Sequence, residues 1–286
     1  MKMAVIGCGL IGGSMALSWK RAGIVDEVIA FGHNPATLQK ALDKGAADTV
    51  TTSMEEAVKD ADIVVSAVPV EAMESVFTEM APFLKSDAVV TDVGSTRQTV
   101  IAAARKGLGD KFHQYAPAHP IAGGEMPGVD YASADLFDEK VVISTPDEGM
   151  DPKVVTFIEE AWRKAGARVQ AMSPLQHDLT FASVSHLPHV LAYALVDMIA
   201  REENAQEKLK MAGAGFRDFT RIASSSPVMW RDICLSNREA LSHELKRYRA
   251  SLDTLQKYID EFDGKALESV FENAVRNRRG LVFPGK

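Results

Sequence analysis

Three glycines near the start of the chain have a spacing that suits phosphate binding. Gly7, Gly9 and Gly12 form the pattern G-x-G-x-x-G between the apolar run Met3–Ile6 and a helical pattern. In this context Gly7 permits a tight turn, Gly9 lets a pyrophosphate approach the backbone, and Gly12 lets the helix pack close to the strand. The free N–H groups and positive dipole end at the start of the helix attract phosphates. The turn therefore predicts a dinucleotide site.

Ser95 and His119 are the residues best suited to proton chemistry. Ser95 ends the run Asp92-Val-Gly-Ser95 after one expected strand, and His119 follows the expected strand 112–118. Ligands of open parallel sheets bind outside the carboxyl ends of the strands, so both side chains should converge beside the cofactor. A neutral histidine can take an alcohol proton near neutral pH, and Pro120 favours an extended backbone at His119. The alternative is that His119 is a structural loop histidine.

The choice between NAD and NADP stays open in the sequence. Strand 27–31 ends at Gly32-His33-Asn34, where neither the acid typical of NAD sites nor a basic group typical of NADP sites is present. His33 or Asn34 could bind a hydroxyl or a 2′-phosphate, although His33 could equally be a plain loop residue. Val68 and Pro69 are small enough to border a nicotinamide. The expected cofactor contacts are Gly7, Gly9, Leu10, Ile11, Gly12, His33, Asn34, Val68, Pro69 and Ser95.

Strands and helices alternate through the first part of the chain, which predicts a parallel sheet with helices on both faces. The expected strands are 3–6, 27–31, 49–52, 61–69, 88–93, 112–118, 140–144 and 167–171. The expected helices are 12–22, 35–44, 54–59, 70–84, 96–106 and 152–165. The fold class is thus an α/β Rossmann-type dinucleotide-binding domain over residues 1–172.

Helical periodicity replaces the β-branched runs from Pro174 onward. Residues 176–201 form a long pattern that Pro188 should kink, and Gly213 and Gly215 break the next one. Further helices are expected over 227–262 and 265–276, and Pro284-Gly-Lys286 resembles a frayed tail. These amphipathic stretches predict an all-helical substrate and dimerisation domain over 173–286, with a homodimer as the assembly.

Composition narrows the class of protein. The net charge of −7 argues against a general nucleic-acid or membrane-surface binder. No secretory signal is expected, and residues 181–200 are interrupted by two histidines, a proline and an aspartate, which favours a buried helix over a membrane span. With two cysteines, no disulfide framework is indicated. We expect a cytoplasmic protein.

The helical part also carries candidate binding residues. His186 and His189 are three apart and share a helix face, but no further ligands at metal spacing accompany them, so no metal site is expected. Arg217, Arg221 and Arg231 are concentrated in an acidic chain and could bind carboxylates. At least one of the three should instead be solvated or paired with a neighbouring aspartate.

Six segments in order make the chain resemble the prephenate/arogenate (cyclohexadienyl) dehydrogenase family of tyrosine biosynthesis. They are Gly7-Cys-Gly-Leu-Ile-Gly-Gly-Ser14, Asp92-Val-Gly-Ser95, His119-Pro-Ile-Ala-Gly123, Ser185-His-Leu-Pro-His189, Gly215-Phe-Arg-Asp-Phe-Thr-Arg221 and Met229-Trp-Arg-Asp232. The resemblance covers nearly the whole chain. It implies NAD(P)-dependent oxidative decarboxylation of prephenate to 4-hydroxyphenylpyruvate, with arogenate as a further candidate substrate.

The same resemblance implies roles for individual residues. His119 resembles the group that accepts the proton of the ring hydroxyl, and Ser95 its hydrogen-bonding partner at that hydroxyl. Arg221 resembles the cation that holds a substrate carboxylate. The remaining expected substrate contacts are His189, Gly123 and Glu125, with Glu125 standing where some relatives keep an acid that gates the pocket.

Two departures from the family pattern concern specificity. His33 and Asn34 stand where NAD-preferring members keep an acid, and Gly124 stands where a hydroxyl residue is common. With no room for a regulatory domain after Leu281, inhibition by tyrosine should be competitive at the substrate pocket. The alternatives are a β-hydroxyacid-type dehydrogenase, which needs a Lys-x-x-x-Asn pattern absent from residues 176–201, and a non-catalytic NAD(P)-binding redox sensor.

Overall fold

An eight-stranded sheet organises the first part of the chain in the computed structural model, which describes residues 1–124 and 126–281. Its spatial order is β3-β2-β1-β4-β5-β6-β7-β8. The strands are β1 (Lys2–Ile6), β2 (Glu27–Phe31), β3 (Thr49–Thr51), β4 (Ile63–Ser66), β5 (Val89–Asp92), β6 (Tyr115–Pro120), β7 (Val141–Ser144) and β8 (Arg168–Ala171). The first six follow the doubly wound order in which the carboxyl ends of β1 and β4 flank a ligand crevice.

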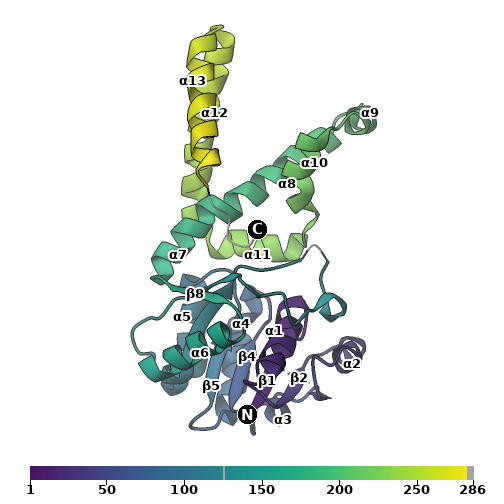
Figure 1. The fold of residues 1–286 in the computed structure, drawn as a ribbon, viewed down its shortest axis with the longest axis vertical. Coiled ribbons are helices and arrows are strands. Elements are labelled where there is room, and N and C mark those ends of the chain that lie inside the picture. The colour runs from purple at the N-terminus through teal and green to yellow at the C-terminus, as the bar shows by residue number, and fades with distance from the viewer. Residues whose placement is uncertain (125, 282–286) are drawn as a thin grey trace.

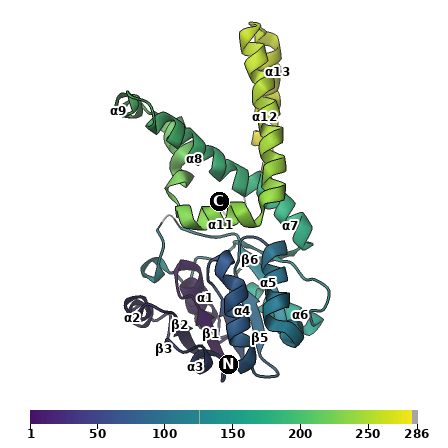
Figure 2. The same ribbon diagram turned by 180° about the vertical axis from the view of Figure 1, so that it is seen from behind.

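Helices cover both faces of this sheet (Figures 1 and 2). They are α1 (Leu10–Arg21), α2 (Pro35–Asp43), α3 (Met54–Val58), α4 (Met73–Met80), α5 (Gln98–Leu108) and α6 (Pro152–Lys164). Buried aromatic rings join α1 to α6, where Trp19 and Trp162 meet edge to face at 5.6 Å. Apolar side chains fill both sides of the central strands, as a sheet between two helical layers requires. The α/β fold class predicted from the sequence is confirmed.

One strand pairing differs from the expected parallel sheet. β6 and β7 are antiparallel, with His119 opposite Ile143, while β7 and β8 are parallel to each other. The described part of segment 121–140 holds one short 3₁₀ turn, Val129–Tyr131, and no crossover helix. A connection of this kind leaves and re-enters the sheet at the same edge, so the next strand must run backwards. The sequence pattern showed the strands but not this reversal.

The second part of the chain is helical and stands above the sheet as two arms (Figure 1). Its helices are α7 (Pro174–Phe181), α8 (Leu187–Ala200), α9 (Ala205–Lys210), α10 (Ala214–Thr220), α11 (Pro227–Ser236), α12 (Arg238–Asp260) and α13 (Gly264–Arg279). Gly213 caps α10, so the expected break falls there, and a second break at Asn237 separates α11 from α12. The predicted tail, Pro284–Lys286, lies outside the described residues.

Pro188 disturbs the long helix where the sequence predicts. A π-helical turn, Ala182–His186, joins α7 to α8, and Pro188 is the second residue of α8. Proline has no N–H to donate to the carbonyl four residues earlier, and widening the preceding turn accommodates that loss. The turn gives His186 and His189 different surroundings although they are three residues apart.

The continuous helical run Pro174–Ala200 is long and apolar enough to cross a membrane by length and composition alone. Its most apolar window has a mean hydropathy of 1.4, yet only 22% of that window is buried within the single chain. The sequence predicted a buried helix, whereas most of this helix is exposed in the single chain. The reason is that the helical part is thin and offers little surface to cover the helix. One such helix is weak support for a membrane protein, because an apolar helix that packs against another subunit passes the same test.

Candidate functional site

The glycine turn has the shape that a dinucleotide requires. Gly7 has a φ of +93°, and a Cβ there would lie 2.7 Å from the carbonyl oxygen of Ala67. A Cβ on Gly12 would lie 2.5 Å from the carbonyl oxygen of Gly7. Gly9 faces open space, since a Cβ there would meet nothing within 4 Å. The backbone is therefore closed where strand and helix pack and open at the helix N-terminus, where phosphate oxygens would bind.

Two other segments border the same turn. A Cβ on Gly7 would stand 3.1 Å from Cγ1 of Val68, which places the end of β4 beside the glycines. A Cβ on Gly124 would stand 3.3 Å from Cδ2 of Leu10, so the loop that follows β6 reaches the start of α1. His119 lies five positions before Gly124 on that strand–loop segment. The candidate base and the dinucleotide turn thus share one edge of the sheet.

The end of β2 carries no acid, as the sequence indicated, and the two residues singled out there behave differently. Asn34 is the N-cap of α2, and its Oδ1 accepts a hydrogen bond from the N–H of Ala36 at 2.9 Å. The Asn34 side chain is exposed. His33 is exposed and packs edge to face on Phe31 at 5.2 Å.

The loop that presents Ser95 is held from both sides. Asp92 Oδ1 accepts from the N–H of Gly94 at 2.7 Å, and the Arg97 guanidinium donates to the carbonyl of Gly94 at 2.8 Å. On the far side, Ser236 of α11 donates to Thr96 Oγ1 at 3.1 Å. Ser95 itself is half-buried. A short hydroxyl side chain on a fixed loop is suited to hydrogen-bonding a ligand.

His119 lies at the centre of a polar cluster that crosses between the two parts of the chain. Its Nδ1 is 2.8 Å from Nε2 of His177 on α7, and Nδ1 of His177 is 2.9 Å from Oδ1 of Asp178. Phe181, one turn further along α7, stacks on the ring of His177 at 4.4 Å and meets the ring of His119 at 5.1 Å. Each imidazole is therefore oriented by a hydrogen bond and by contact with the ring of Phe181.

The protonation states of this cluster follow from burial and charge. Burial lowers the pKa of His119 well below its ordinary value, and the nearby His177 and Arg97 lower it further, so its imidazole is neutral at physiological pH. Burial alone would raise the pKa of Asp178, but hydrogen bonds from His177 and from the N–H groups of Arg97 and Gln98 outweigh it and lower that pKa. The cluster therefore joins a neutral His119 through His177 to an ionised, fixed carboxylate at Asp178.

A second cluster of candidate residues lies in the helical part. The ring of His189 stacks on Trp230 with centroids 3.6 Å apart, and its Nδ1 is 2.9 Å from the carbonyl oxygen of Ser185. Burial lowers the pKa of His189, and the positive charge of Arg221 lowers it further, so these two side chains are neighbours. Trp230 is buried and its Nε1 has no hydrogen-bond partner within the described chain.

His186 has a structural role. It is 1% exposed, and the Nδ2 of Asn237 donates to its Nδ1 at 3.2 Å. Burial lowers the pKa of His186 from 6.5 to about 4. Both observations assign it a neutral ring inside the helical part.

Acid should destabilise the protein through His186. The unfolded chain protonates this ring near its ordinary pKa while the folded state does not, so between about pH 6.5 and pH 4 the unfolded state binds more protons and the free energy of unfolding falls as pH falls. From about pH 7 to about pH 5 this contributes a loss of about 2 kcal/mol. Urea unfolding of His186→Asn at both pH values should show a loss smaller by that amount, and equal losses in the two proteins would contradict the assignment.

Two family profiles match the chain in succession. "Prephenate dehydrogenase, nucleotide-binding domain" matches residues 15–171, and "Prephenate dehydrogenase, dimerization domain" matches residues 173–273.

The chain belongs to the prephenate dehydrogenase family.

Individual relatives agree with this assignment. The chain is 36% identical over 281 residues to the cyclohexadienyl dehydrogenase of Zymomonas mobilis, covering 98% of this chain and 95% of that protein. It is 35% identical to the prephenate dehydrogenase of Bacillus subtilis, covering 98% of this chain and 76% of that one. The crystal structure of Aquifex aeolicus prephenate dehydrogenase with hydroxyphenyl propionate and NAD⁺ has a TM-score of 0.90 at 34% identity, covering 98% of both chains. The predicted family and oxidoreductase class are confirmed.

Within this prephenate dehydrogenase fold, most residues predicted from the sequence lie either at the sheet edge or in the cluster around His189. Ser95, His119 and the glycine turn share the sheet edge, and His189 and Arg221 lie together in the helical part. A Cβ on Gly123 would meet nothing within 4 Å. Glu125 lies outside the described residues. Arg231 is the predicted paired arginine, since it bonds Asp232 at 2.7 Å.

Sequence reasoning missed His177, Asp178 and Arg97. His177 and Asp178 open the helical part just after Ser173, and an adjacent pair of titratable residues at a domain entrance was the available signal. In the sequence, Arg97 is one polar residue at the start of an expected helix. In the structure it is fully buried and makes a bidentate ion pair with Asp92 at 2.8 Å. Its partner lies five positions earlier, at the end of β5.

Proposed function

We propose that this chain catalyses the NAD(P)-dependent oxidative decarboxylation of prephenate to 4-hydroxyphenylpyruvate, with arogenate as a second candidate substrate. The observation that carries the proposal is His119, a half-buried neutral histidine at the sheet edge that also bears the dinucleotide turn. The family and the ligands named for the Aquifex aeolicus structure support it.

The residues present fit a nicotinamide dinucleotide. The open backbone at Gly9 and the free N–H groups of α1 would bind the pyrophosphate, and Val68, Pro69 and Ser95 would border the nicotinamide. When bound, this cofactor supplies the hydride acceptor. His33 and the Nδ2 of Asn34 would contact the adenosine ribose, and the absence of an acid there supports use of NADP as well as NAD.

The chain itself contributes proton removal and orientation. His119 takes the proton of the ring hydroxyl while the carbon that bears this hydroxyl is oxidised, and Ser95 hydrogen-bonds the same hydroxyl. The resulting dienone loses the para carboxylate as CO₂, and the gain of aromaticity makes the step irreversible. No further acid or metal ion is needed, so the remaining contributions are positioning and exclusion of water.

Arg221 would hold a substrate carboxylate, with His189 beside it. We expect Arg221→Met to raise KM for prephenate about 10- to 100-fold, because a hydrogen bond to a charged group contributes roughly 1.5–3 kcal/mol. The matched control is Arg201→Met, which removes an exposed arginine paired with Asp197 on α8 and should leave KM unchanged. Steady-state kinetics of both variants would reject the role if KM changed equally in the two.

Tyrosine should compete at this same site, because it shares the phenol ring and a carboxylate with the product. We expect tyrosine to raise KM for prephenate without lowering kcat. An unchanged rate at high tyrosine concentration would contradict this mode of inhibition.

The direct test of the proposed function is the initial rate of nicotinamide reduction with prephenate and with arogenate, each combined with NAD and NADP. A rate with either substrate supports the function, and the ratios give the two specificities. Cofactor binding without a rate in all four combinations would favour the redox sensor, and a rate with a β-hydroxyacid instead would favour the other dehydrogenase class.

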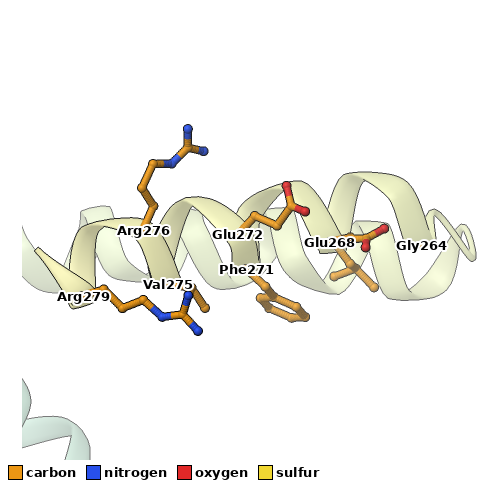
Figure 3. Close-up of a pocket in the computed structure, with 8 residues that line it drawn as sticks. Gly264, Glu268, Phe271, Glu272, Val275, Arg276 and Arg279 are labelled. Atoms are coloured by element: carbon orange, nitrogen blue, oxygen red, sulfur yellow. The ribbon is translucent and has the colours of Figure 1, made fainter.

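We further propose that two copies of the chain assemble through their helical parts, as the dimerization domain profile suggests. Both arms expose large apolar side chains in the single chain, including Met198, Leu252, Ile259 and Phe271. On one face of α13, Phe271 and Val275 point the same way (Figure 3). A second copy would cover these faces, and sedimentation should give twice the chain's mass of 31.0 kDa.

The domain boundary and location complete the proposal. We place the dinucleotide-binding domain at residues 1–172 and the helical substrate and dimerisation domain at 173–286, because β8 ends at Ala171 and α7 begins at Pro174. A cytoplasmic location fits a family of soluble enzymes. Limited proteolysis and cell fractionation test these two statements separately.

A further inference from the structure

The hydrogen bonds around His119 continue into a chain of three side chains that spans both domains. His119 belongs to β6, whereas His177 and Asp178 belong to α7 of the helical part. The two links measure 2.8 Å and 2.9 Å. Both α7 residues are almost fully buried, so water cannot easily replace either link.

Asp178 is fixed in place from the opposite side. Its Oδ1 accepts from the N–H of Arg97 at 2.8 Å and its Oδ2 from the N–H of Gln98 at 2.9 Å. Helix α5 has no capping side chain of its own at this end, so Asp178 satisfies its free N–H groups from the other domain. The carboxylate is thus bound to the same loop that presents Ser95.

The direction of each hydrogen bond follows from that carboxylate. An ionised aspartate can only accept, so Nδ1 of His177 must carry the proton that points to Asp178. Nε2 of the neutral His177 then has a lone pair and must accept from Nδ1–H of His119. The remaining nitrogen of His119, Nε2, is left unprotonated.

We propose that His177 and Asp178 are positioning residues that hold His119 in the one tautomer whose Nε2 can act as the base. The proposal rests on the proposed function. The ring hydroxyl gives its proton to Nε2 of His119, the new positive charge is stabilised through His177 by Asp178, and Nε2 returns the proton to solvent after product release. Asp178 stays ionised throughout, as the carboxylate does in a Ser-His-Asp triad.

The arrangement also makes the base depend on the contact between the two domains. Without α7 against the sheet, His119 would lose the acceptor for its Nδ1–H and could adopt either tautomer. The charged or titratable groups that face His119 in the described structure are His177, His186 and Arg97, which all oppose its protonation. The negative charge of Asp178 acts on His119 only through His177, and we call these three linked side chains the relay.

Two substitutions of His177 separate positioning from packing. His177→Phe keeps an aromatic ring against Phe181 but removes the acceptor, so we expect kcat for prephenate to fall about 100-fold with little change in KM. In His177→Gln the Oε1 can take the place of Nε2 and accept from His119, so kcat should stay within about 10-fold of the parent enzyme. Equal kcat values in the two variants would overturn the proposal.

Asp178→Asn tests the second link. The asparagine amide can donate to Nδ1 of His177 and reverse the chain, so kcat should again fall about 100-fold. In a His177→Gln background the introduced glutamine amide can orient itself without Asp178, so the same Asp178 substitution should cost less than about 10-fold. Equal losses in both backgrounds would indicate a merely structural role and overturn the proposal.

These outcomes are distinct from failure of the proposed function. An inactive parent enzyme with intact cofactor binding contradicts the function itself. An active parent enzyme whose His177→Phe and Asp178→Asn variants keep full kcat contradicts only the relay. Thermal unfolding of each variant shows whether it is folded at the assay temperature.

Discussion

His119→Asn should lower kcat for prephenate by roughly two to four orders of magnitude. The substitution removes the nitrogen that would take the hydroxyl proton, while asparagine still occupies the end of β6 and can hydrogen-bond His177. The dinucleotide turn lies on other elements, so cofactor affinity should be unchanged. Steady-state kinetics and a separate titration of NAD binding measure the two effects independently.

His113→Asn is the matched control for this substitution. His113 is an exposed histidine in the turn before β6, and its Nδ1 lies 2.8 Å from the carbonyl oxygen of Asp110. Its loss should leave kcat within experimental error. Activity that survives in His119→Asn would show that His119 is not the base.

Arg97→Met should destabilise the fold by roughly 3–5 kcal/mol, the usual cost of removing one partner of a buried ion pair. The guanidinium is fully buried and binds both carboxylate oxygens of Asp92 at 2.8 Å. Burial alone would lower the pKa of Arg97, but the charge of Asp92 outweighs it and raises that pKa. Without the arginine, the Asp92 carboxylate would stay buried with the Tyr115 hydroxyl and the Gly94 N–H as its remaining donors among the described residues. Chemical denaturation measures the change.

The double variant Asp92→Leu/Arg97→Met is the companion experiment. It removes both charges together, so it should recover at least half of the loss seen in the single variant, because a buried ion pair often contributes little beyond an apolar pair of similar volume. A loss below about 1 kcal/mol in Arg97→Met would mean that the ion pair is dispensable. If the double variant were no more stable than Arg97→Met, the loss of stability would have to arise from other contacts in the Ser95 loop.

The sequence predicted the elements of the α/β part closely because apolar runs and turn residues are local signals. Strand 27–31 and helix 152–165 agree with β2 and α6 to within one residue. The expected strand 61–69 shortens to Ile63–Ser66, because the chain turns away from the sheet before Pro69. The β6–β7 reversal depends on the path of segment 121–140, which no local pattern encodes.

The site was predicted in halves. The rule for sheet edges led to the proposal of Ser95 and His119, because both follow strands, and the resemblance led to the proposal of His189 and Arg221. His177 was missed because it lies 58 positions from His119 on a helix whose docking the sequence does not show. The buried helix expected at 181–200 is largely uncovered in one chain, because the helical part is too thin to cover it.

The most direct measurement of the central claim follows the atoms of the substrate. Prephenate carrying deuterium on the carbon that bears the ring hydroxyl would be incubated with the enzyme and NAD or NADP. We predict that deuterium appears in the reduced nicotinamide and that each reduction releases one CO₂ and one 4-hydroxyphenylpyruvate. Reduction of the nicotinamide without release of CO₂, or bound cofactor that stays oxidised with both prephenate and arogenate, would contradict the account.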